Sequence, residues 1–378
     1  MSEKNTDIGK LVEVFNSQKD KTIYYILFKI TDINNVMKDS LNIAIAGATG
    51  YVGLELIRLL SKHPKIRIIY LCANKSSGKK ISYFDKELRK KKLPKITKIT
   101  NINWNKIDII FTALPNGEAQ KIAKKIPNHI KLIDLSADFR LQNEKIYKKW
   151  YGIKHNSKHL IKKSIYAITE FTRNKLTNYK IISCPGCYPT SIQIPLIPLI
   201  KNKMINIKNI TVDSKSGYSG AGKNIKKKFN FKNLFNSVSA YSIGSHRHMA
   251  EIDQEFYKVS KKKMKVSFTP HLIPMFRGIL STIYIDNSKH KNNAIKIYNF
   301  LKQYHKKNYF VKLAKFNNAI GTGEVMNTNF CKISVCKDRE NKGIIILSAI
   351  DNLIKGAAGQ AVQNMNVAFK MKETLGLL

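Results

Sequence analysis

Residues 42–60 of this chain read NIAIAGATGYVGLELIRLL. The apolar run Asn42–Ala46 is typical of a short β-strand, and the periodic stretch Leu54–Leu60 is typical of a helix. In a strand–glycine turn–helix unit the backbone comes close to a pyrophosphate, and the helix N-terminus faces its charge. The stretch therefore predicts a dinucleotide site, with a purely structural turn as the alternative. Its expected binding residues are Gly47, Thr49, Gly50, Tyr51, Val52 and Gly53.

The next predicted strand, Ile66–Cys72, indicates which dinucleotide is bound. An NAD site places an acidic residue near the end of this strand, where it holds the ribose 2′-hydroxyl. Residues 73–79 read ANKSSGK and contain no acid. Hydroxyls and lysines suit a 2′-phosphate, so we expect NADP(H), with Asn74, Lys75 and Ser76 in contact with it.

Further strand–turn–helix units follow this one. Asp108–Thr112 precedes a helix from Glu118, and Lys131–Leu135 is followed by Ser136–Arg140. Such repetition indicates a doubly wound parallel sheet, with ligands at the strand ends. The second half has a different texture that suggests an α+β domain. Its predicted strands are Ile210–Ser214, Lys265–Thr269, Ile279–Asp286, Lys332–Cys336 and Ile344–Ala349.

A candidate nucleophile lies between the two halves. The strand Lys180–Ser183 ends in Cys184-Pro-Gly-Cys187, and Tyr188–Ile200 is predicted to be a helix with Cys187 in its first turn. A helix N-terminus favours thiolate, the form that attacks acyl groups. The alternatives are a buried structural cysteine, a redox dithiol with Cys184, or half of a metal site.

Three stretches of the second half look like site material. Ser216–Lys223 is a loop of small residues, from which we expect Ser219 and Gly220 to approach the cofactor through the backbone, with a flexible surface loop as the alternative. Gly244–Glu251 places His246 and His248 around Arg247, a set that can supply a general base, an anion clamp and an orienting carboxylate. The five cysteines are not spaced to complete a zinc set with these histidines, so no metal is predicted. Asp351–Asn364 begins a helix rich in small residues. This composition indicates either close helix packing or a polar helix start that contacts the cofactor.

The composition limits the class of protein. The formal net charge is +42, but only eight of the 67 basic residues are arginine, and the lysines are spread along the chain. We therefore expect no specific nucleic-acid partner, although Arg89–Lys92, Lys226–Lys228 and Lys261–Lys263 are runs that can bind polyanions weakly. Five cysteines suit a reducing compartment. The apolar run Ile23–Phe28 is too short to span a membrane, and we expect a soluble cytoplasmic protein.

Taken as an ordered set, these motifs resemble the N-acetyl-γ-glutamyl-phosphate reductases, relatives of aspartate-semialdehyde dehydrogenase. The similarity covers roughly residues 41–378 and includes Pro270–Leu280. It implies an α/β Rossmann domain (41–186 with 350–378) and an α+β catalytic and dimerisation domain (187–349) of the glyceraldehyde-3-phosphate dehydrogenase type, forming a dimer or tetramer. Residues 1–40 have no counterpart in it, and Cys184 stands where family members often have Asn.

The resemblance also implies roles for single residues. Cys187 corresponds to the nucleophile and His246 to the acid/base, with His248 as the alternative. Asn352 lies where the nicotinamide end is approached. The substrate's phosphate and carboxylate are expected to meet the three arginines of the motif segments, Arg140, Arg247 and Arg277.

The predicted reaction is NADPH-dependent reduction of N-acetyl-γ-glutamyl phosphate to N-acetylglutamate 5-semialdehyde through a thioacyl enzyme, a step of arginine biosynthesis. The nearest alternative is the same chemistry on another acyl phosphate, either the small molecule aspartyl phosphate or carrier-bound aminoadipyl phosphate. A dithiol redox protein and a basic nucleic-acid-binding protein are alternatives of other classes.

Overall fold

A computed structural model describes residues 40–223, 236–288, 290 and 292–378. The chain divides into Met1–Leu41 and Asn42–Leu378, and the fold below is that of the second unit. The predicted N-terminal extension (1–40, apart from Ser40) and the run Lys226–Lys228 lie outside the described residues.

The first sheet is parallel and has seven strands within the described part of the chain, in the order β3-β2-β1-β4-β5-β7-β6. Its central strands are apolar because both faces are covered, and all four residues of β4 are buried. The strands are β1 (Leu41–Ala46), β2 (Ile66–Cys72), β3 (Ile96–Thr97), β4 (Ile109–Thr112), β5 (Lys131–Asp134), β6 (Ser164–Tyr166) and β7 (Ile181–Ser183).

The second sheet is mixed and also has seven described strands, in the order β12-β13-β14-β11-β8-β10-β9. Burial alternates along β11, as expected for a sheet with one covered face. The strands are β8 (Ile210–Gly217), β9 (Ser239–Ala240), β10 (Ser267–Ile273), β11 (Ile279–Asp286), β12 (Val311–Leu313), β13 (Cys331–Lys337) and β14 (Gly343–Ile350).

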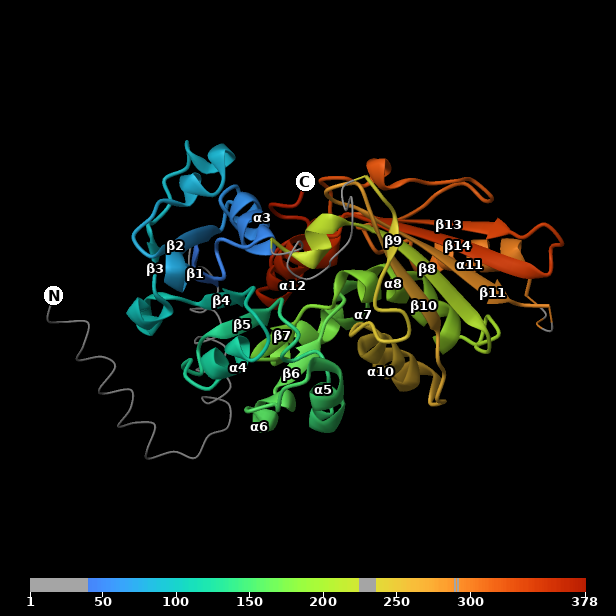
Figure 1. Ribbon diagram of the computed structural model, residues 1–378, viewed down its shortest axis with the longest axis horizontal. Coiled ribbons are helices and arrows are strands. Elements are labelled where there is room, and N and C mark those ends of the chain that lie inside the picture. The colour runs from blue at the N-terminus through green and yellow to red at the C-terminus, as the bar shows by residue number, and fades with distance from the viewer. Residues whose placement is uncertain (1–39, 224–235, 289, 291) are drawn as a thin grey trace, which may run out of the picture. The chain divides into compact units, whose positions relative to one another are not determined.

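The α-helices lie around and between the two sheets (Figure 1). They are α3 (Tyr51–Leu60), α4 (Glu118–Ala123), α5 (Glu144–Tyr151), α6 (Lys158–Ile161), α7 (Thr169–Thr172), α8 (Cys187–Lys201), α10 (Met249–Ser260), α11 (Ala294–Tyr304) and α12 (Gly359–Ala368). Short 3₁₀ turns are η1 (Asn74–Ser76), η2 (Ile81–Tyr83), η3 (Lys86–Leu88), η4 (Ile99–Asn101), η5 (Trp104–Lys106), η6 (Arg173–Asn178), η7 (Tyr218–Ala221) and η8 (Thr322–Glu324), and η9 (Ile354–Ala358) is a π-helical turn.

Helix α8 forms the centre of the second half. Every residue from Tyr188 to Ile200 is buried, and the helix packs against β11, β14, α10 and α11. A mostly apolar helix that is buried all round belongs in a core, and this one contains Pro195 and Pro198. The predicted helix after Ser183 is thus confirmed, and Cys187 is its first residue.

The last helix returns to the first sheet. After β14 the chain makes the π-helical turn η9, and α12 then packs against α3, β5 and α7. The expected class, a Rossmann-type parallel sheet followed by an α+β region, is confirmed. The short strands β6, β9 and β12 and the helices α10 and α11 were not predicted from the sequence.

Candidate active site

A cavity of about 790 Å³ opens at the carboxyl ends of the parallel strands and is lined by segments from both halves. All twelve residues expected to bind the cofactor line it, together with Cys187 and Arg140. His248, the alternative acid/base, also lines it, as do residues to which the sequence assigned no role, among them Ala113, Leu114, Pro115, Gly186, Lys223, Leu353 and Gly356.

The glycine turn has the close backbone packing that a phosphate cradle needs. Gly47 has φ +91°, and a Cβ there would lie 2.2 Å from the carbonyl oxygen of Ala113. A Cβ on Gly53 would lie 2.1 Å from the carbonyl oxygen of Gly47, whereas one on Gly50 would meet that oxygen at 3.5 Å, an ordinary contact. The first-turn amides of α3 lack helical acceptors and line the cavity, so the site fits a dinucleotide pyrophosphate.

The end of β2 supplies polar groups to the same cavity. Asn74 and Lys75 are exposed and Ser76 is half-buried in η1. Lys223 reaches the cavity from the second half, with its Nζ 5.4 Å from the centre of the Tyr51 ring. Burial lowers the pKa of Lys223 from its ordinary value, and Asp85 opposes this shift. In the sequence, Lys223 is indicated as a site residue by its position at the end of the small-residue loop Ser216–Lys223.

An adjoining apolar slot of about 650 Å³ shares Gly47, Ala73 and Asn74 with the main cavity. The slot lies between the ends of β1 and β2 and the start of α4. Its walls include Ile99, Trp104, Leu114, Pro115 and Ile122. A flat aromatic group fits such a slot.

Asn352 is held in a fixed orientation at the far end of the cavity. Its Nδ2 donates to Ser219 Oγ at 2.9 Å, and its Oδ1 accepts the Gly278 N–H at 2.7 Å. Because Ser219 and Gly220 line the cavity beside it, the predicted grouping of these three residues is present in the structure.

Cys187 lies between two glycines that allow very close packing. A Cβ on Gly186 would lie 2.4 Å from His248 Nε2, and a Cβ on Gly356 would lie 2.7 Å from the Cys187 Cβ. The imidazole therefore rests against the residue before the cysteine, and the π-helical turn rests against the cysteine itself. Any side chain at either glycine would separate these groups.

The N-terminus of α8 favours the thiolate of Cys187, as expected from the sequence, but burial outweighs this effect. Burial raises the pKa of the Cys187 thiol to about 11. The charge of Arg140 and the backbone N–H of Tyr188 lower it, but their combined effect is smaller. The neutral thiol is therefore the resting form at neutral pH, and attack requires a base.

Of the two histidines, His248 lines the cavity with Cys187, and His246 is not among the lining residues. The His246 ring packs edge-on against Tyr188, Tyr241 and Phe268. Its Nδ1 accepts the backbone N–H of His248 at 3.2 Å.

Both imidazoles are neutral at pH 7. Burial and the charge of Arg247 lower the pKa of His246 to about 4. Burial, with nearby His246, Arg140 and Arg247, lowers the pKa of His248 well below its ordinary value. A neutral imidazole beside a neutral thiol is the pair that general-base activation uses.

The spacing of the motif suggested that Glu251 orients the imidazole of His248. The structure shows no hydrogen bond between the two side chains. Glu251 Oε1 is 3.9 Å from His248 Nε2, whereas it lies 3.0 Å from Arg140 NH1. Its Oε2 accepts the Gly186 N–H at 2.9 Å and the Tyr166 hydroxyl at 3.1 Å. The carboxylate therefore fixes the turn before Cys187.

The three arginines lie in different surroundings. Arg140 lines the cavity, and it donates to the carbonyl oxygens of Cys184 at 2.9 Å and Leu135 at 3.0 Å. Arg247 is exposed and stacks over the Tyr151 ring at 5.5 Å. Arg277 is paired with two acidic groups, Glu55 Oε2 at 2.9 Å and Asp351 Oδ2 at 3.1 Å. The structure thus does not gather the three guanidinium groups into one clamp.

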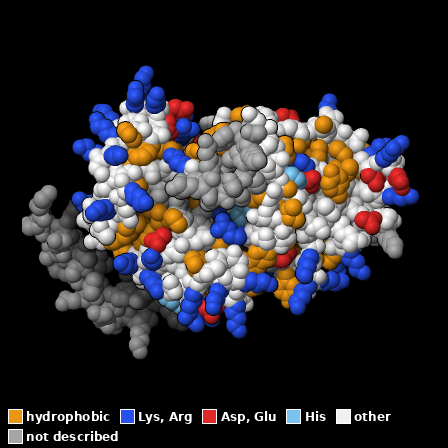
Figure 2. All heavy atoms as spheres, in the orientation of Figure 1, with side chains coloured by type: hydrophobic (Ala, Val, Ile, Leu, Met, Phe, Trp, Pro, Cys, Tyr) orange, Lys and Arg blue, Asp and Glu red, His pale blue; other side chains and the backbone are white. Residues whose placement is uncertain are grey.

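Cys184 is buried behind the site, and its Sγ accepts from Asn364 Nδ2 at 3.7 Å. Burial raises its pKa to about 12. In the described part of the chain no helix is long and apolar enough to cross a membrane. Lys and Arg side chains are spread over the visible face of the molecule rather than gathered into one stripe (Figure 2).

Fold and site define a semialdehyde dehydrogenase. Residues 42–179 match the family model "semialdehyde dehydrogenase, NAD binding domain", and residues 187–352 match "semialdehyde dehydrogenase, dimerisation domain". Within this class, the chain belongs to the N-acetyl-γ-glutamyl-phosphate reductase family.

Curated relatives of that name show this membership. The protein of Afipia carboxidovorans is 41% identical over 346 residues, which are 90% of this chain and 98% of the relative. The protein of Alkaliphilus metalliredigens is 42% identical over 336 residues, or 88% and 96% of the two chains. A probable chloroplastic enzyme of rice is 40% identical over 339 residues, or 90% and 81%.

Solved structures agree in fold. Aspartate semialdehyde dehydrogenase II of Vibrio cholerae has a TM-score of 0.66 at 19% identity, covering 88% of this chain and 99% of its own. The Candida albicans enzyme, crystallised with NADP, has a TM-score of 0.63 at 17% identity, with the same coverage.

Proposed function

We propose that this protein reduces N-acetyl-γ-glutamyl phosphate to N-acetylglutamate 5-semialdehyde with NADPH, releasing phosphate. One observation carries the proposal: Cys187 and His248 open into the same cavity as the glycine turn of α3. A nucleophile, a neutral base and a dinucleotide cradle are the parts that a reductase of acyl phosphates needs. The names of the curated relatives support the substrate.

In this proposal, different parts of the dinucleotide bind in the main cavity and in the adjoining slot. The first-turn amides of α3 would hold the pyrophosphate, the apolar slot would hold the adenine, and Asn352 with Ser219 would hold the nicotinamide end. Lys75 and Ser76 would bind the 2′-phosphate, because no acid follows β2. Lys223 would add positive charge near the phosphates. When bound, the nicotinamide supplies a hydride.

The chemistry at Cys187 proceeds in two parts. His248 takes the thiol proton, the sulfur attacks the acyl carbon, and the carbon–oxygen bond to phosphate breaks, leaving a thioester on Cys187. Amides at the N-terminus of α8 stabilise the oxyanion. The proton that His248 received goes to the departing phosphate. After reduction the carbon–sulfur bond breaks, the aldehyde leaves, and His248 passes a proton taken from solvent to the Cys187 sulfur.

Arg140 and Arg247 are the proposed partners of the substrate anions. Arg140 lines the cavity, and Arg247 is exposed and adjacent to His248 in the chain. The contacts of Arg277 support a different role. Its guanidinium joins Glu55 of α3 to Asp351, the residue before Asn352, and so positions the cofactor site.

The second half carries a dimerisation-domain match, so the protein self-associates. We propose a dimer or a dimer of dimers that forms through the open face of the mixed sheet, where Tyr284 is 45% exposed. We also propose that residues 41–186 with 350–378 form the dinucleotide-binding domain and 187–349 the catalytic domain. Five free cysteines support a reducing compartment such as the cytoplasm.

A coupled assay tests the substrate. Each of three acyl phosphates, N-acetyl-γ-glutamyl, aspartyl and carrier-bound aminoadipyl phosphate, is generated in situ, and NADPH oxidation is followed. We expect the N-acetylglutamyl compound to be used at least 10²-fold more efficiently, because a site built around one polar side chain rejects analogues that lack it. Faster turnover of either alternative would overturn the substrate assignment.

A further inference from the structure

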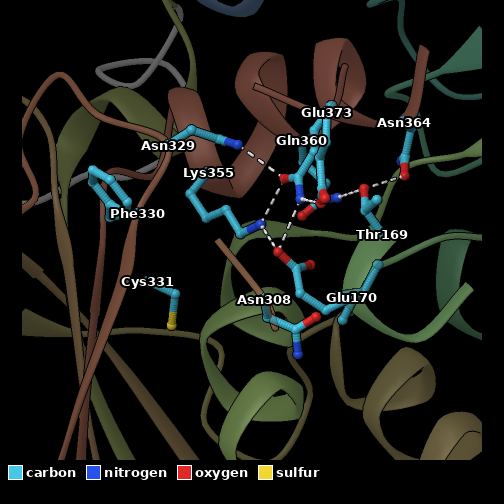
Figure 3. Close-up of polar contacts among 12 residues, drawn as sticks. Thr169, Glu170, Asn308, Asn329, Phe330, Cys331, Lys355, Gln360, Asn364 and Glu373 are labelled. Carbon is cyan, nitrogen blue, oxygen red and sulfur yellow. Dashed lines mark hydrogen bonds and ion pairs between the residues drawn. The ribbon is translucent and has the colours of Figure 1, made fainter. Parts of the chain in front are cut away.

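A buried ion pair lies behind Cys187 and has no role in the steps above. Lys355 and Glu170 are both fully buried, and Lys355 Nζ is 2.6 Å from Glu170 Oε1. Figure 3 shows the ammonium reaching from the π-helical turn η9 toward the carboxylate on α7. Burial alone would raise the pKa of Glu170, but the charge and hydrogen bond of Lys355, with one from Gln363, outweigh it and lower that pKa.

Such a pair is a weak way to gain stability. Removing two charges from water costs much of what their attraction returns, and apolar residues of similar volume are often as stable or more so. In some proteins, however, a buried polar or ionic group specifies one arrangement of the elements that it joins. The position of the pair therefore indicates what it specifies.

The pair holds the segment that packs directly on the nucleophile. Gly356, the next residue after Lys355, approaches Cys187 so closely that a Cβ would lie 2.7 Å from the Cys187 Cβ. The turn is π-helical, with Gly356 N–H donating to Asp351 O at 2.9 Å and Ala358 N–H donating to Leu353 O at 2.8 Å. π-helical turns are rare and occur often at functional sites.

A layer of amides links the pair to the chain just before Cys187. Gln363 accepts from Lys355 at 2.8 Å and donates to Glu170 at 3.0 Å. The next residue, Asn364, donates to Ala167 O at 3.0 Å and to Cys184 Sγ at 3.7 Å. The layer thus touches both sides of the nucleophile: η9 on one side and the Cys184 turn on the other.

We propose that Lys355 and Glu170 are positioning residues, whose ion pair sets the distance between η9 and the start of α8 and thereby holds the Cys187 thiol toward the cofactor and His248. The role in turnover rests on the proposed function, whereas the effect on the thiol does not. Neither side chain lines the cavity, so both act through Gly356 and the backbone of η9.

The test uses the double substitution Lys355→Met with Glu170→Gln, because either single change leaves an uncompensated or unpartnered group in the core. We measure the thermal unfolding midpoint, the NADPH dissociation constant by fluorescence, kcat, and the rate of Cys187 carbamidomethylation at one fixed pH by peptide mass spectrometry. Arg173→Met is the matched control, since it removes a pair with Glu373 (2.9 Å) at the outer, half-exposed edge of the same layer.

The double variant should keep its unfolding midpoint and bind NADPH within about twofold of the unmodified protein. Its kcat should fall roughly tenfold to a hundredfold, as expected for a small displacement of a reacting group. The carbamidomethylation rate of Cys187 should change more than fivefold, while Arg173→Met should leave it unchanged. An unchanged carbamidomethylation rate in the double variant would overturn the proposal, whether or not the protein is less stable. If the carbamidomethylation rate changes but the unmodified protein reduces no acyl phosphate, the proposed function is wrong and the positioning role stands.

Discussion

Two helices begin at the same cavity, α3 at Tyr51 and α8 at Cys187, and they use their N-termini differently. At α3 the turn is built from consecutive residues, and its backbone is the proposed binding group. At α8 the cysteine is surrounded by groups from remote segments, among them Arg140, Glu251 and Gly356, and burial outweighs the helix terminus by raising the thiol pKa to about 11. A helix N-terminus therefore does not by itself predict a thiolate.

Removing the nucleophile should show most clearly that the starts of α3 and α8 have different roles. Cys187→Ser should lower kcat by more than ~10⁴-fold, because a serine hydroxyl is a far weaker nucleophile at this site. NADPH affinity should stay near that of the unmodified protein, since the α3 turn is untouched. Steady-state kinetics and fluorescence titration measure the two quantities. More than a few per cent of residual activity would exclude covalent catalysis through Cys187.

The two histidines should have unequal effects. His248→Asn should lower kcat by ~10²–10⁴-fold, the usual range for a positioned acid/base, and His246→Asn should cost less than about tenfold. The reason is that His248 lines the cavity and His246 packs among aromatic rings. The reverse order in turnover assays would restore His246 as the acid/base.

Adding one methyl group tests the packing around each helix start. Gly186→Ala should lower kcat by about tenfold or more with the cofactor affinity unchanged, because its Cβ would displace the His248 ring. Gly50→Ala is the matched control at α3, where the nearest atom to a Cβ is 3.5 Å away. We expect Gly50→Ala to fold and to weaken NADPH binding without the same loss of kcat. If Gly186→Ala turned over normally, the contact with His248 would be unimportant.

Charge substitutions should sharpen the account of the α3 site. Lys223→Gln should weaken NADPH and NADH alike by roughly tenfold, the loss of about one charge-assisted contact. Lys75→Asp should weaken NADPH alone, by about fivefold, because Lys75 is exposed and is the proposed partner of the 2′-phosphate. Dissociation constants of NADPH and NADH for each variant show whether a lysine contributes to binding both cofactors or NADPH alone. Equal binding of the two by the unmodified protein would refute the 2′-phosphate pocket.

The pH dependence should show the smallest effects. The pKa of His248 is depressed, so the base stays neutral and active as pH falls through 6.5, and kcat/KM should decline only at lower pH. Carbamidomethylation of Cys187 should keep rising with pH toward about 11, the raised thiol pKa. A plateau near pH 8 would mean that the thiol has an ordinary pKa. Cys184→Ala should follow the unmodified profile, because Cys184 is buried behind the site.

Local patterns were enough for much of the fold. Strands β2 and β11 were predicted with the bounds that the structure has, because their apolar patterns and lengths are clear. Strands β9 and β12 were missed, since two or three residues carry no periodicity of their own. Helix α10 was missed because the preceding motif was interpreted only as chemistry.

The candidate site divides in the same way. The glycine turn, Asn74–Ser76 and Cys187 were predicted as site residues and line one cavity, because each was recognised from consecutive residues. The position of His248 rather than His246 in the cavity, and the pairing of Arg277 with Glu55 and Asp351, could not be predicted, because each depends on segments far apart in the chain.

The sequence by itself determined the parallel sheet, the dinucleotide turn and the cysteine at a helix start, since these follow from backbone geometry and hydrophobic period over a few residues. Only the tertiary structure decided the protonation state of that cysteine, which histidine faces it, and the buried Lys355–Glu170 pair behind it. The physical reason is that burial and Coulomb interactions are set by distance in space. In this chain Lys355 and Glu170 are 185 residues apart and their charged atoms 2.6 Å apart.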